Sequence, residues 1–203
     1  MKLVLFDWNG TLLDDTLLWY DVVLKVFHTF GKQAPTLEQY FRELEGDYFI
    51  IYTSRGIDVT RERLNEIYAK HYQALMYQAP LMPGAQEVLQ ALHDSTHALY
   101  LVTGQLESLV SPLLEKFGIV SYFKSRKFHV TDKAGVINEV LEMEKVEPKN
   151  CFYVGDTPSD MRHAKKAGIV SIAFLGGHIP NECIANSQPD FSIQQLRDIL
   201  TIV

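Results

Sequence analysis

Short apolar runs alternate along the chain with segments of helical periodicity, and this alternation limits the possible folds more than any other feature. The runs are rich in Val, Leu, Ile and aromatic residues, and each stops at a Gly-containing turn: residues 2–6, 98–102, 151–154 and 170–175. The intervening segments carry apolar residues at helical spacing: residues 85–92, 106–117, 134–143 and 159–167. Buried strands joined through helices form right-handed crossovers, so their sheet is parallel and covered on both faces. We therefore expect an α/β fold with a doubly wound parallel sheet.

One long stretch interrupts this alternation. Residues 15–79 contain no comparable apolar run, only helix-like segments at 16–30 and 60–77. The alternation resumes at Pro83-Gly84, where Pro83 suits the first turn of a helix. The pattern predicts a core domain formed by residues 1–14 and 80–203, with an α-helical domain inserted at residues 15–79.

The composition and net charge limit the classes of molecule that the protein is expected to bind. The 203 residues are 47% hydrophobic and 22% charged, as in folded globular domains, and the formal net charge is −6. Nucleic acids and anionic membranes attract clustered positive charge, so we expect neither as a partner, and a small molecule instead. No apolar run reaches the length of a membrane span or of a signal peptide, which predicts a cytoplasmic protein. The oligomeric state stays open between monomer and homodimer.

Polar side chains stand where the apolar runs end. Asp7 follows the first run, Thr103 the second and Asp156 the third. Ligands of open parallel sheets bind beyond the carboxyl ends of the strands, so these positions are expected to meet in one crevice. Lys133, at the start of a helix-like segment, and Asp160, four residues after Asp156, are placed to join them. The sequence thus predicts a cluster of three carboxylates, one hydroxyl and one ammonium group.

The chemistry of this cluster suggests a metal and a phosphate. Three carboxylates repel one another unless a cation holds them, and oxygen ligands without His or Cys favour Mg²⁺. The cation in turn attracts a phosphate, to which Thr103 and the backbone N–H groups of residues 8–11 could donate hydrogen bonds. Lys133 offsets negative charge, which leaves Asp7 as a nucleophile able to form an aspartyl-phosphate.

These residues form four motifs, and through them the chain resembles the haloacid dehalogenase superfamily over almost its whole length. The motifs are DWNGT at residues 7–11, Thr103 in VTG at 102–104, Lys133, and GDTPSD at 155–160. Their order and separations match the family. The resemblance is closest to small-molecule phosphatases of the phosphoglycolate phosphatase type. It implies a Rossmann-like core domain and a helical C1 cap at residues 15–79 that closes over the crevice.

The resemblance also implies roles for individual residues. Asp7 would be the nucleophile of a phosphatase that hydrolyses small phosphorylated metabolites. Mg²⁺ would be held by Asp7, the backbone carbonyl of Asn9 and Asp156, with Asp160 in or next to the metal shell. The residues expected to bind the phosphoryl group are Trp8, Gly10, Thr11, Thr103, Gly104 and Lys133.

Asn9 departs from the family pattern. Typical phosphatases of this family have an Asp at this position, which protonates the leaving alcohol and then activates water, and Asn cannot exchange a proton at neutral pH. Four interpretations remain: a leaving group that needs no acid, a substitute acid from the cap, transfer of the phosphoryl group to another acceptor, or a weak enzyme retained for binding or regulation. A metal-independent dehalogenase that uses Asp7 on carbon is a further alternative, against which Asp156 and Asp160 argue.

Three further features lie outside the four motifs. Arg55 could bind a substrate carboxylate through its forked donors. Asp14 and Asp15 precede a helix-like segment and are expected to cap it. The basic residues at 124–127 are expected to form a solvated surface.

Overall fold

The computed structural model describes residues 1–43, 47–177 and 179–203. The chain divides into two compact units, Met1–Asp14 with Pro80–Val203, and Asp15–Ala79. We call the first the core unit and the second the insert unit, and each is described by itself.

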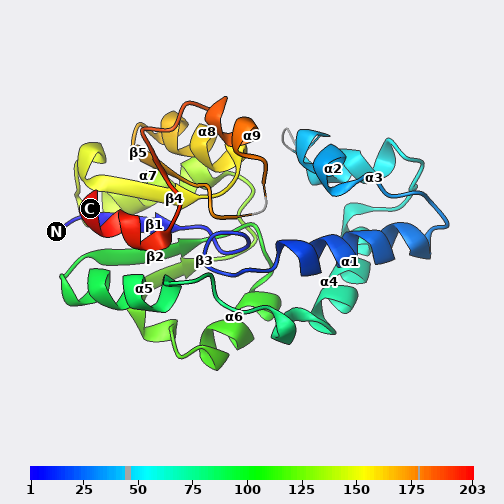
Figure 1. The fold of residues 1–203 in the computed structure, drawn as a ribbon, viewed down its shortest axis with the longest axis horizontal. Coiled ribbons are helices and arrows are strands. Elements are labelled where there is room, and N and C mark those ends of the chain that lie inside the picture. The colour runs from blue at the N-terminus through cyan, green and yellow to red at the C-terminus, as the bar shows by residue number, and fades with distance from the viewer. Residues whose placement is uncertain (44–46, 178) are drawn as a thin grey trace. The chain divides into compact units, whose positions relative to one another are not determined.

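The core unit contains a parallel sheet with the strand order β3-β2-β1-β4-β5-β6. Strands β1 to β5 are labelled in Figure 1. The strands are β1 (Leu3–Phe6), β2 (Ala98–Val102), β3 (Phe123–Lys127), β4 (Cys151–Gly155), β5 (Val170–Phe174) and β6 (Phe191–Ile193). Every residue of β1, β2 and β4 is buried, which explains why their sequences are continuously apolar instead of alternating. The predicted α/β fold with a parallel sheet is confirmed.

Helices pack on the sheet of the core unit. They are α5 (Ala85–Asp94), α6 (Glu107–Lys116), α7 (Lys133–Glu144), α8 (Pro158–Ala167) and the short α9 (Asn181–Ala185). On one face, α7 and α8 contribute Ile137, Val140 and Ala164 to a buried cluster that includes Leu5 and Tyr153 of the sheet. Successive side chains of a strand point to opposite faces, so each central strand supplies both layers of the core.

Two strands, β3 and β6, were not expected from the sequence. They lie at the two edges of the sheet, where a strand has one neighbour and one exposed side. In β3 the exposed Lys124 and Arg126 alternate with less exposed residues, so the basic cluster at 124–127 is an edge strand with charged side chains on its solvent side. Charged residues are a common feature of edge strands, because they discourage pairing with other chains.

The insert unit is helical over its described residues. It contains α1 (Thr16–Thr29), α2 (Leu37–Glu43), α3 (Tyr48–Thr53), α4 (Arg61–Gln73) and the 3₁₀ turn η1 (Met76–Gln78). Its small core is aromatic: the rings of Phe27 and Tyr52 stack with centroids 4.9 Å apart, and those of Trp19 and Tyr40 meet edge to face at 4.8 Å. Aromatic pairs of this kind add stability beyond the area that they bury.

Asp15 corrects one expectation about the start of α1. It occupies the N-cap position, but its side chain makes no capping hydrogen bond. The Asp15 carboxylate instead accepts a hydrogen bond of 2.6 Å from the hydroxyl of Tyr72 in α4, and both side chains are buried. The contact joins residues 57 positions apart, and sequence reasoning restricted to local capping could not anticipate it.

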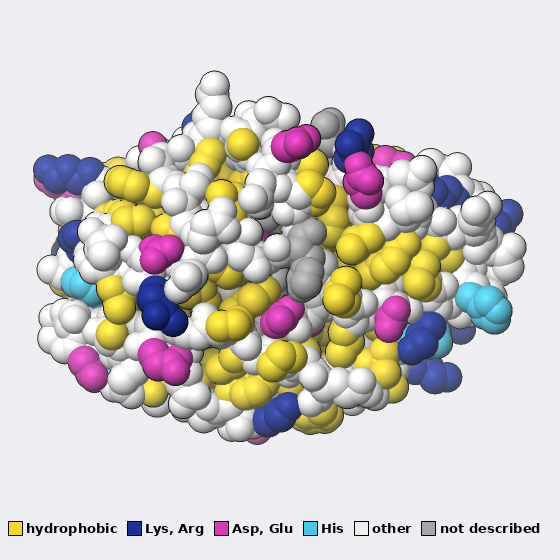
Figure 2. Space-filling model, viewed as in Figure 1, with side chains coloured by type: hydrophobic (Ala, Val, Ile, Leu, Met, Phe, Trp, Pro, Cys, Tyr) yellow, Lys and Arg dark blue, Asp and Glu magenta, His cyan; other side chains and the backbone are white. Residues whose placement is uncertain are grey.

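The surface shown in Figure 2 carries Lys and Arg side chains interspersed with Asp and Glu side chains. Among the described residues, no helix combines the length and the apolar character needed to cross a membrane.

Candidate active site

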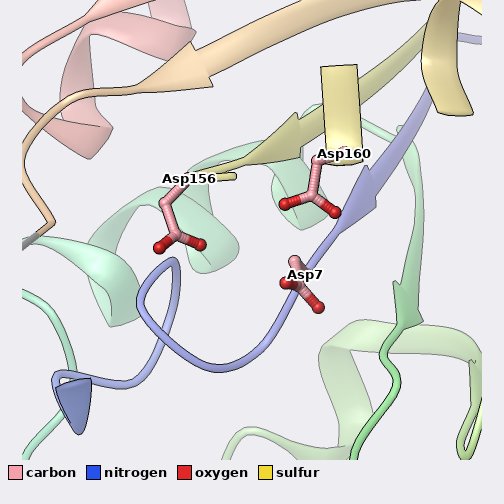
Figure 3. A group of neighbouring side chains, drawn as sticks. All are labelled: Asp7, Asp156 and Asp160. Atoms are coloured by element: carbon pink, nitrogen blue, oxygen red, sulfur yellow. The ribbon is translucent and has the colours of Figure 1, made fainter. Parts of the chain in front are cut away.

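Three carboxylates meet at the carboxyl edge of the sheet in the core unit (Figure 3). Asp7 follows β1, Asp156 follows the neighbouring strand β4, and Asp160 lies in the first turn of α8. One oxygen from each carboxylate lies within 4.8 Å of the other two, and all three residues are buried. The backbone fixes this arrangement, since β1 and β4 pair in register and the N–H of Asp7 donates to the carbonyl of Val154 at 2.9 Å.

Lys133 joins the cluster as its cation. It is the first residue of α7, and its Nζ lies 2.6 Å from Oδ1 of Asp160 and 3.0 Å from Oδ1 of Asp7. Burial tends to lower the pKa of this ammonium group, but the carboxylates of Asp160 and Asp7 outweigh that effect and raise its pKa well above the usual range. Lys133 therefore remains charged at neutral pH.

Burial, with a contribution from neighbouring carboxylates, raises the pKa values of two carboxyl groups in the cluster, Asp7 and Asp156. Burial, reinforced by Asp160, raises the pKa of Asp7 from 3.8 to about 6 despite the opposing effect of Lys133. Burial also raises the pKa of Asp156 well above its ordinary value, with Asp160 and Asp7 adding to the shift. Among the described side chains that form ion pairs with these carboxylates, Lys133 supplies one positive charge against three negative ones, so full ionisation leaves two negative charges uncompensated. A divalent cation would supply the missing charge.

The loop after Asp7 holds Asp156 in place. The hydroxyl of Thr11 donates to Oδ1 of Asp156 at 2.8 Å. Gly10 has a φ of +72°, and a Cβ atom at this position would lie 2.2 Å from Oδ2 of Asp156. The backbone N–H of Gly10 donates to the carbonyl of Leu13, and that of Thr11 to the carbonyl of Trp8. Gly10 and Thr11 therefore contact Asp156 and stabilise the loop, in addition to the phosphate binding predicted for them from the sequence.

Asp160 is held by a capping box at the start of α8. Oγ1 of Thr157 accepts a hydrogen bond from the N–H of Asp160, while Oδ2 of Asp160 accepts from the N–H of Thr157 at 3.1 Å and from its hydroxyl at 2.6 Å. Both oxygens of Asp160 therefore have protein donors, Oδ1 from Lys133 and Oδ2 from Thr157. Thr157 was not among the predicted site residues, although a Thr three residues before an acidic residue is the sequence pattern of a capping box.

Thr103 lies at the same edge of the sheet. It follows β2, which pairs with β1, and it is 1% exposed. Its N–H donates to the carbonyl of Lys127 at 3.0 Å, and its Oγ1 accepts from the N–H of Gln105 at 3.1 Å. These contacts fix the turn that contains Gly104. A threonine hydroxyl can also donate one hydrogen bond, which is the contact that a phosphoryl oxygen would require of Thr103.

Arg55 belongs to the insert unit, where it follows α3. Its Nη2 lies 2.7 Å from Oε1 of Glu43, and its Nη1 donates to the carbonyl of Ile51 at 3.1 Å. The guanidinium therefore makes contacts within the insert unit, and its role in substrate recognition stays a prediction.

Comparison with known proteins gives this arrangement a family. The sequence pattern of the haloacid dehalogenase-like hydrolases matches residues 4–174. Phosphoglycolate phosphatases are among the relatives: that of Vibrio vulnificus strain YJ016 is 27% identical over an alignment of 227 positions, gaps included, which covers 100% of this chain and 96% of the relative. That of Aquifex aeolicus is also 27% identical and is covered over 97% of its length.

Solved structures show the same fold. A haloacid dehalogenase-like hydrolase from Streptococcus pneumoniae superposes with a TM-score of 0.82 at 23% identity, covering 100% of this chain and 98% of the other. A hydrolase from Pseudomonas syringae gives a TM-score of 0.84 at 16% identity, with coverage of 99% and 97%. The matched range includes Asp7, Thr103, Lys133, Asp156 and Asp160, the residues from which the site was built. This chain belongs to the haloacid dehalogenase-like hydrolase family.

Proposed function

We propose that this protein is a Mg²⁺-dependent phosphatase that hydrolyses small phosphorylated metabolites through an aspartyl-phosphate on Asp7. The observation that carries the proposal is the buried cluster of Asp7, Asp156 and Asp160 with Lys133 bound to two of its members. The relatives named phosphoglycolate phosphatase support the same reaction class.

The donor set fits Mg²⁺. Its side-chain ligands are carboxylate oxygens, which hard divalent cations prefer. Burial raises the pKa values of Asp7 and Asp156, and a bound cation would favour their ionised forms. Asp7, Asp156 and the backbone carbonyl of Asn9 would hold the ion, with Asp160 next to it. When bound, Mg²⁺ supplies charge neutralisation and polarises a phosphoryl oxygen.

Each residue of the site has its own role in the proposed reaction. An oxygen of Asp7 attacks the phosphorus atom, the bond between phosphorus and the leaving-group oxygen breaks, and its electron pair stays with that oxygen. Water then attacks the phosphorus atom of the aspartyl-phosphate, which releases phosphate and restores the carboxylate of Asp7. Lys133 keeps its proton and stabilises the charge that builds up on the phosphoryl oxygens, to which Thr103 donates a hydrogen bond. The backbone N–H groups of Trp8 and Gly104 complete the phosphate site in this proposal, since those of Gly10 and Thr11 donate within the loop.

The insert unit acts as a cap in this proposal. It would exclude water from the site and select substrates, and Arg55 is the candidate for binding a substrate carboxylate. The proposal places the enzyme in the cytoplasm with small molecules as its partners.

Asn9 supports a second candidate function. A protein without an acid at this position could bind phosphorylated ligands for regulation, or transfer the phosphoryl group from Asp7 to an acceptor other than water. Both functions would use the same cluster and the same Mg²⁺ site. A metal-independent dehalogenase would leave Asp156 and Asp160 without a task.

Phosphate release in Mg²⁺ and in EDTA, across acyl, aryl and alkyl phosphates, tests the proposal. We expect turnover that requires Mg²⁺ and disappears in Asp7→Asn. Asp94→Asn is the matched control, since Asp94 is exposed at the end of α5 and should leave turnover unchanged. Turnover that persists in EDTA or in Asp7→Asn would contradict the proposed mechanism. Tight binding of beryllium fluoride with Mg²⁺ in the absence of any turnover would favour the regulatory alternative.

A further inference from the structure

Tyr153 contacts two parts of the site, although it belongs to none of the four motifs. It is the third residue of β4, three positions before Asp156, and its side chain is fully buried on the face of the sheet that α7 and α8 cover. The Nζ of Lys133 lies over its ring, 5.5 Å from the centroid. Its hydroxyl donates a hydrogen bond of 3.0 Å to the backbone carbonyl of Val102.

The contact with Lys133 restricts a side chain that is otherwise flexible. A lysine side chain has four rotatable carbon–carbon bonds. The carboxylates of Asp7 and Asp160 bind the ammonium group of Lys133 at its end, but they do not fix the path of the chain that leads to it. The ring of Tyr153 offers its negative face to the same ammonium group from the sheet. Cation–π attraction is strongest where the cation is desolvated, and the side chain of Lys133 is only 12% exposed.

The hydroxyl contact acts on the other side of the site. Val102 is the last residue of β2, and its carbonyl group belongs to the peptide bond that leads into Thr103. A hydrogen bond to this carbonyl restricts the rotation of that peptide and thereby the direction of the Thr103 side chain. One buried phenol therefore contacts both the lysine and the backbone of the threonine that the proposed function assigns to the phosphoryl group.

We infer that Tyr153 is a positioning residue: its ring sets the place of the Lys133 ammonium group, and its hydroxyl sets the end of β2 that carries Thr103. The inference rests on the proposed function for its catalytic consequence. The positioning of Lys133 itself is a property of the folded protein and can be measured without any substrate.

Substitutions at Tyr153 separate the two contacts. Tyr153→Phe keeps the ring and removes the hydroxyl, with its hydrogen bond to Val102 and its electrostatic interaction with Lys133, whereas Tyr153→Leu removes both the ring and the hydroxyl. Phe152→Leu is the matched control, because Phe152 is the adjacent residue of β4, is 5% exposed, points to the opposite face, and has the Nζ of Lys2 at 5.3 Å from its ring centroid. Tyr153→Met, with an unbranched side chain that fills the space more completely, replaces Tyr153→Leu where the latter does not fold.

The first measurement is the ¹³C–¹H spectrum of the protein with ¹³C-labelled lysine, in which Lys133→Arg identifies the signal of Lys133. We expect a ring-current shift of the Lys133 Cε protons that persists in Tyr153→Phe and in Phe152→Leu and is lost in Tyr153→Leu or Tyr153→Met. An unchanged Lys133 signal in the variants without the ring would overturn the inference.

The second measurement is kcat and KM with Mg²⁺ and an aryl phosphate. We expect kcat to fall about tenfold in Tyr153→Leu, to recover partly in Tyr153→Phe, and to stay near the native value in Phe152→Leu. An equal loss in Tyr153→Leu and Phe152→Leu would reduce Tyr153 to a packing residue and overturn its catalytic part. Absence of turnover in the native protein would instead count against the proposed function, and the lysine spectrum would still decide the position of Lys133.

Discussion

Gly10 lies so close to Asp156 that a Cβ atom at position 10 would be 2.2 Å from Oδ2 of the carboxylate. The next residue, Thr11, donates to the other oxygen, Oδ1, at 2.8 Å. The loop that begins at Asp7 therefore determines how the carboxylate of Asp156 is turned, although the two motifs are more than a hundred residues apart in the chain. Two properties of glycine are used here at once, the absence of Cβ and the tolerance of a φ of +72°.

Gly10→Ala is expected to weaken Mg²⁺ binding, because the new methyl group displaces the carboxylate of Asp156. Gly118→Ala is its control: Gly118 has a φ of +67°, but a Cβ atom there would lie more than 4 Å from the described residues other than its chain neighbours. Both variants should lose roughly 1–2 kcal/mol of unfolding free energy from the left-handed backbone. Only Gly10→Ala should also lose affinity in a calorimetric titration with Mg²⁺. Equal affinity in the two variants would show that Asp156 tolerates the displacement.

Thr157→Val is expected to release Asp160. The valine keeps the shape of the threonine but removes Oγ1, which accepts from the N–H of Asp160 and donates to its Oδ2. Loss of an N-cap of this kind costs about 1 kcal/mol. We expect that loss in urea denaturation, together with weaker Mg²⁺ binding. Thr157→Ser retains the oxygen and should behave like the native protein, and a serine variant as impaired as the valine variant would contradict this account.

The stability of the metal-free protein should depend on the ionisation of Asp7. Its pKa is about 6 in the folded protein against an ordinary value of 3.8, so between these pH values the folded state holds a proton that the unfolded state has lost. The contribution of Asp7 to the unfolding free energy therefore falls as the pH rises from about 4 to about 6, by at most about 3 kcal/mol. Asp7→Asn removes the titrating group, so in EDTA its stability relative to the native protein should be greater at pH 7.5 than at pH 4.5.

Urea denaturation of the two proteins at both pH values measures this difference. Mg²⁺ at pH 7.5 should stabilise the native protein and reduce the advantage of Asp7→Asn, because binding to the folded state alone raises the unfolding free energy. A difference between the two proteins that does not change with pH would show that the carboxyl group of Asp7 is ionised equally easily in the folded and unfolded states.

The central strands and the candidate site were predictable from the sequence for the same physical reason. A strand buried on both faces must be apolar throughout, so β1, β2 and β4 are visible as uninterrupted runs, and a polar residue directly after such a run lies at the ligand-binding edge of the sheet. Asp7, Thr103 and Asp156 were found in this way, and the structure places all three at that edge.

The features that the sequence did not predict depend on contacts between distant residues. Edge strand β3 has the sequence FKSRK. The alternation between more and less exposed side chains in this strand can be recognised only when its pairing with β2 is known. Tyr153 lies within an apolar run, where its ring resembles any other core residue until Lys133 is placed over it. The sequence around Asp15 predicts a cap at the start of α1, but its carboxylate accepts a hydrogen bond from Tyr72, which lies on another helix. Local patterns cannot distinguish these alternatives, because their energies are decided by tertiary packing.

Asn9→Asp is expected to change which phosphates the protein hydrolyses. Asn9 cannot protonate a leaving group, and general acid–base catalysis contributes about 10²–10⁴ in rate. An alkyl alkoxide is a poor leaving group that needs the proton, whereas an acyl or aryl phosphate does not. The native protein should therefore favour acyl and aryl over alkyl phosphates, and Asn9→Asp should raise kcat for alkyl phosphates by about 10² or more while changing kcat for acyl phosphates little.

Steady-state kinetics over a series of phosphates with increasing leaving-group pKa measures this change, as the slope of log kcat against that pKa. The slope should be steep in the native protein and shallow in Asn9→Asp. Asn9→Ser is the control, since serine is a polar residue that also cannot supply a proton at neutral pH and should retain the steep slope. A shallow slope in the native protein would mean that another residue already acts as the acid, and the insert unit would be the first place to seek it. The metal site should be the same in all three proteins, because residue 9 is expected to contribute its backbone carbonyl, which every residue has.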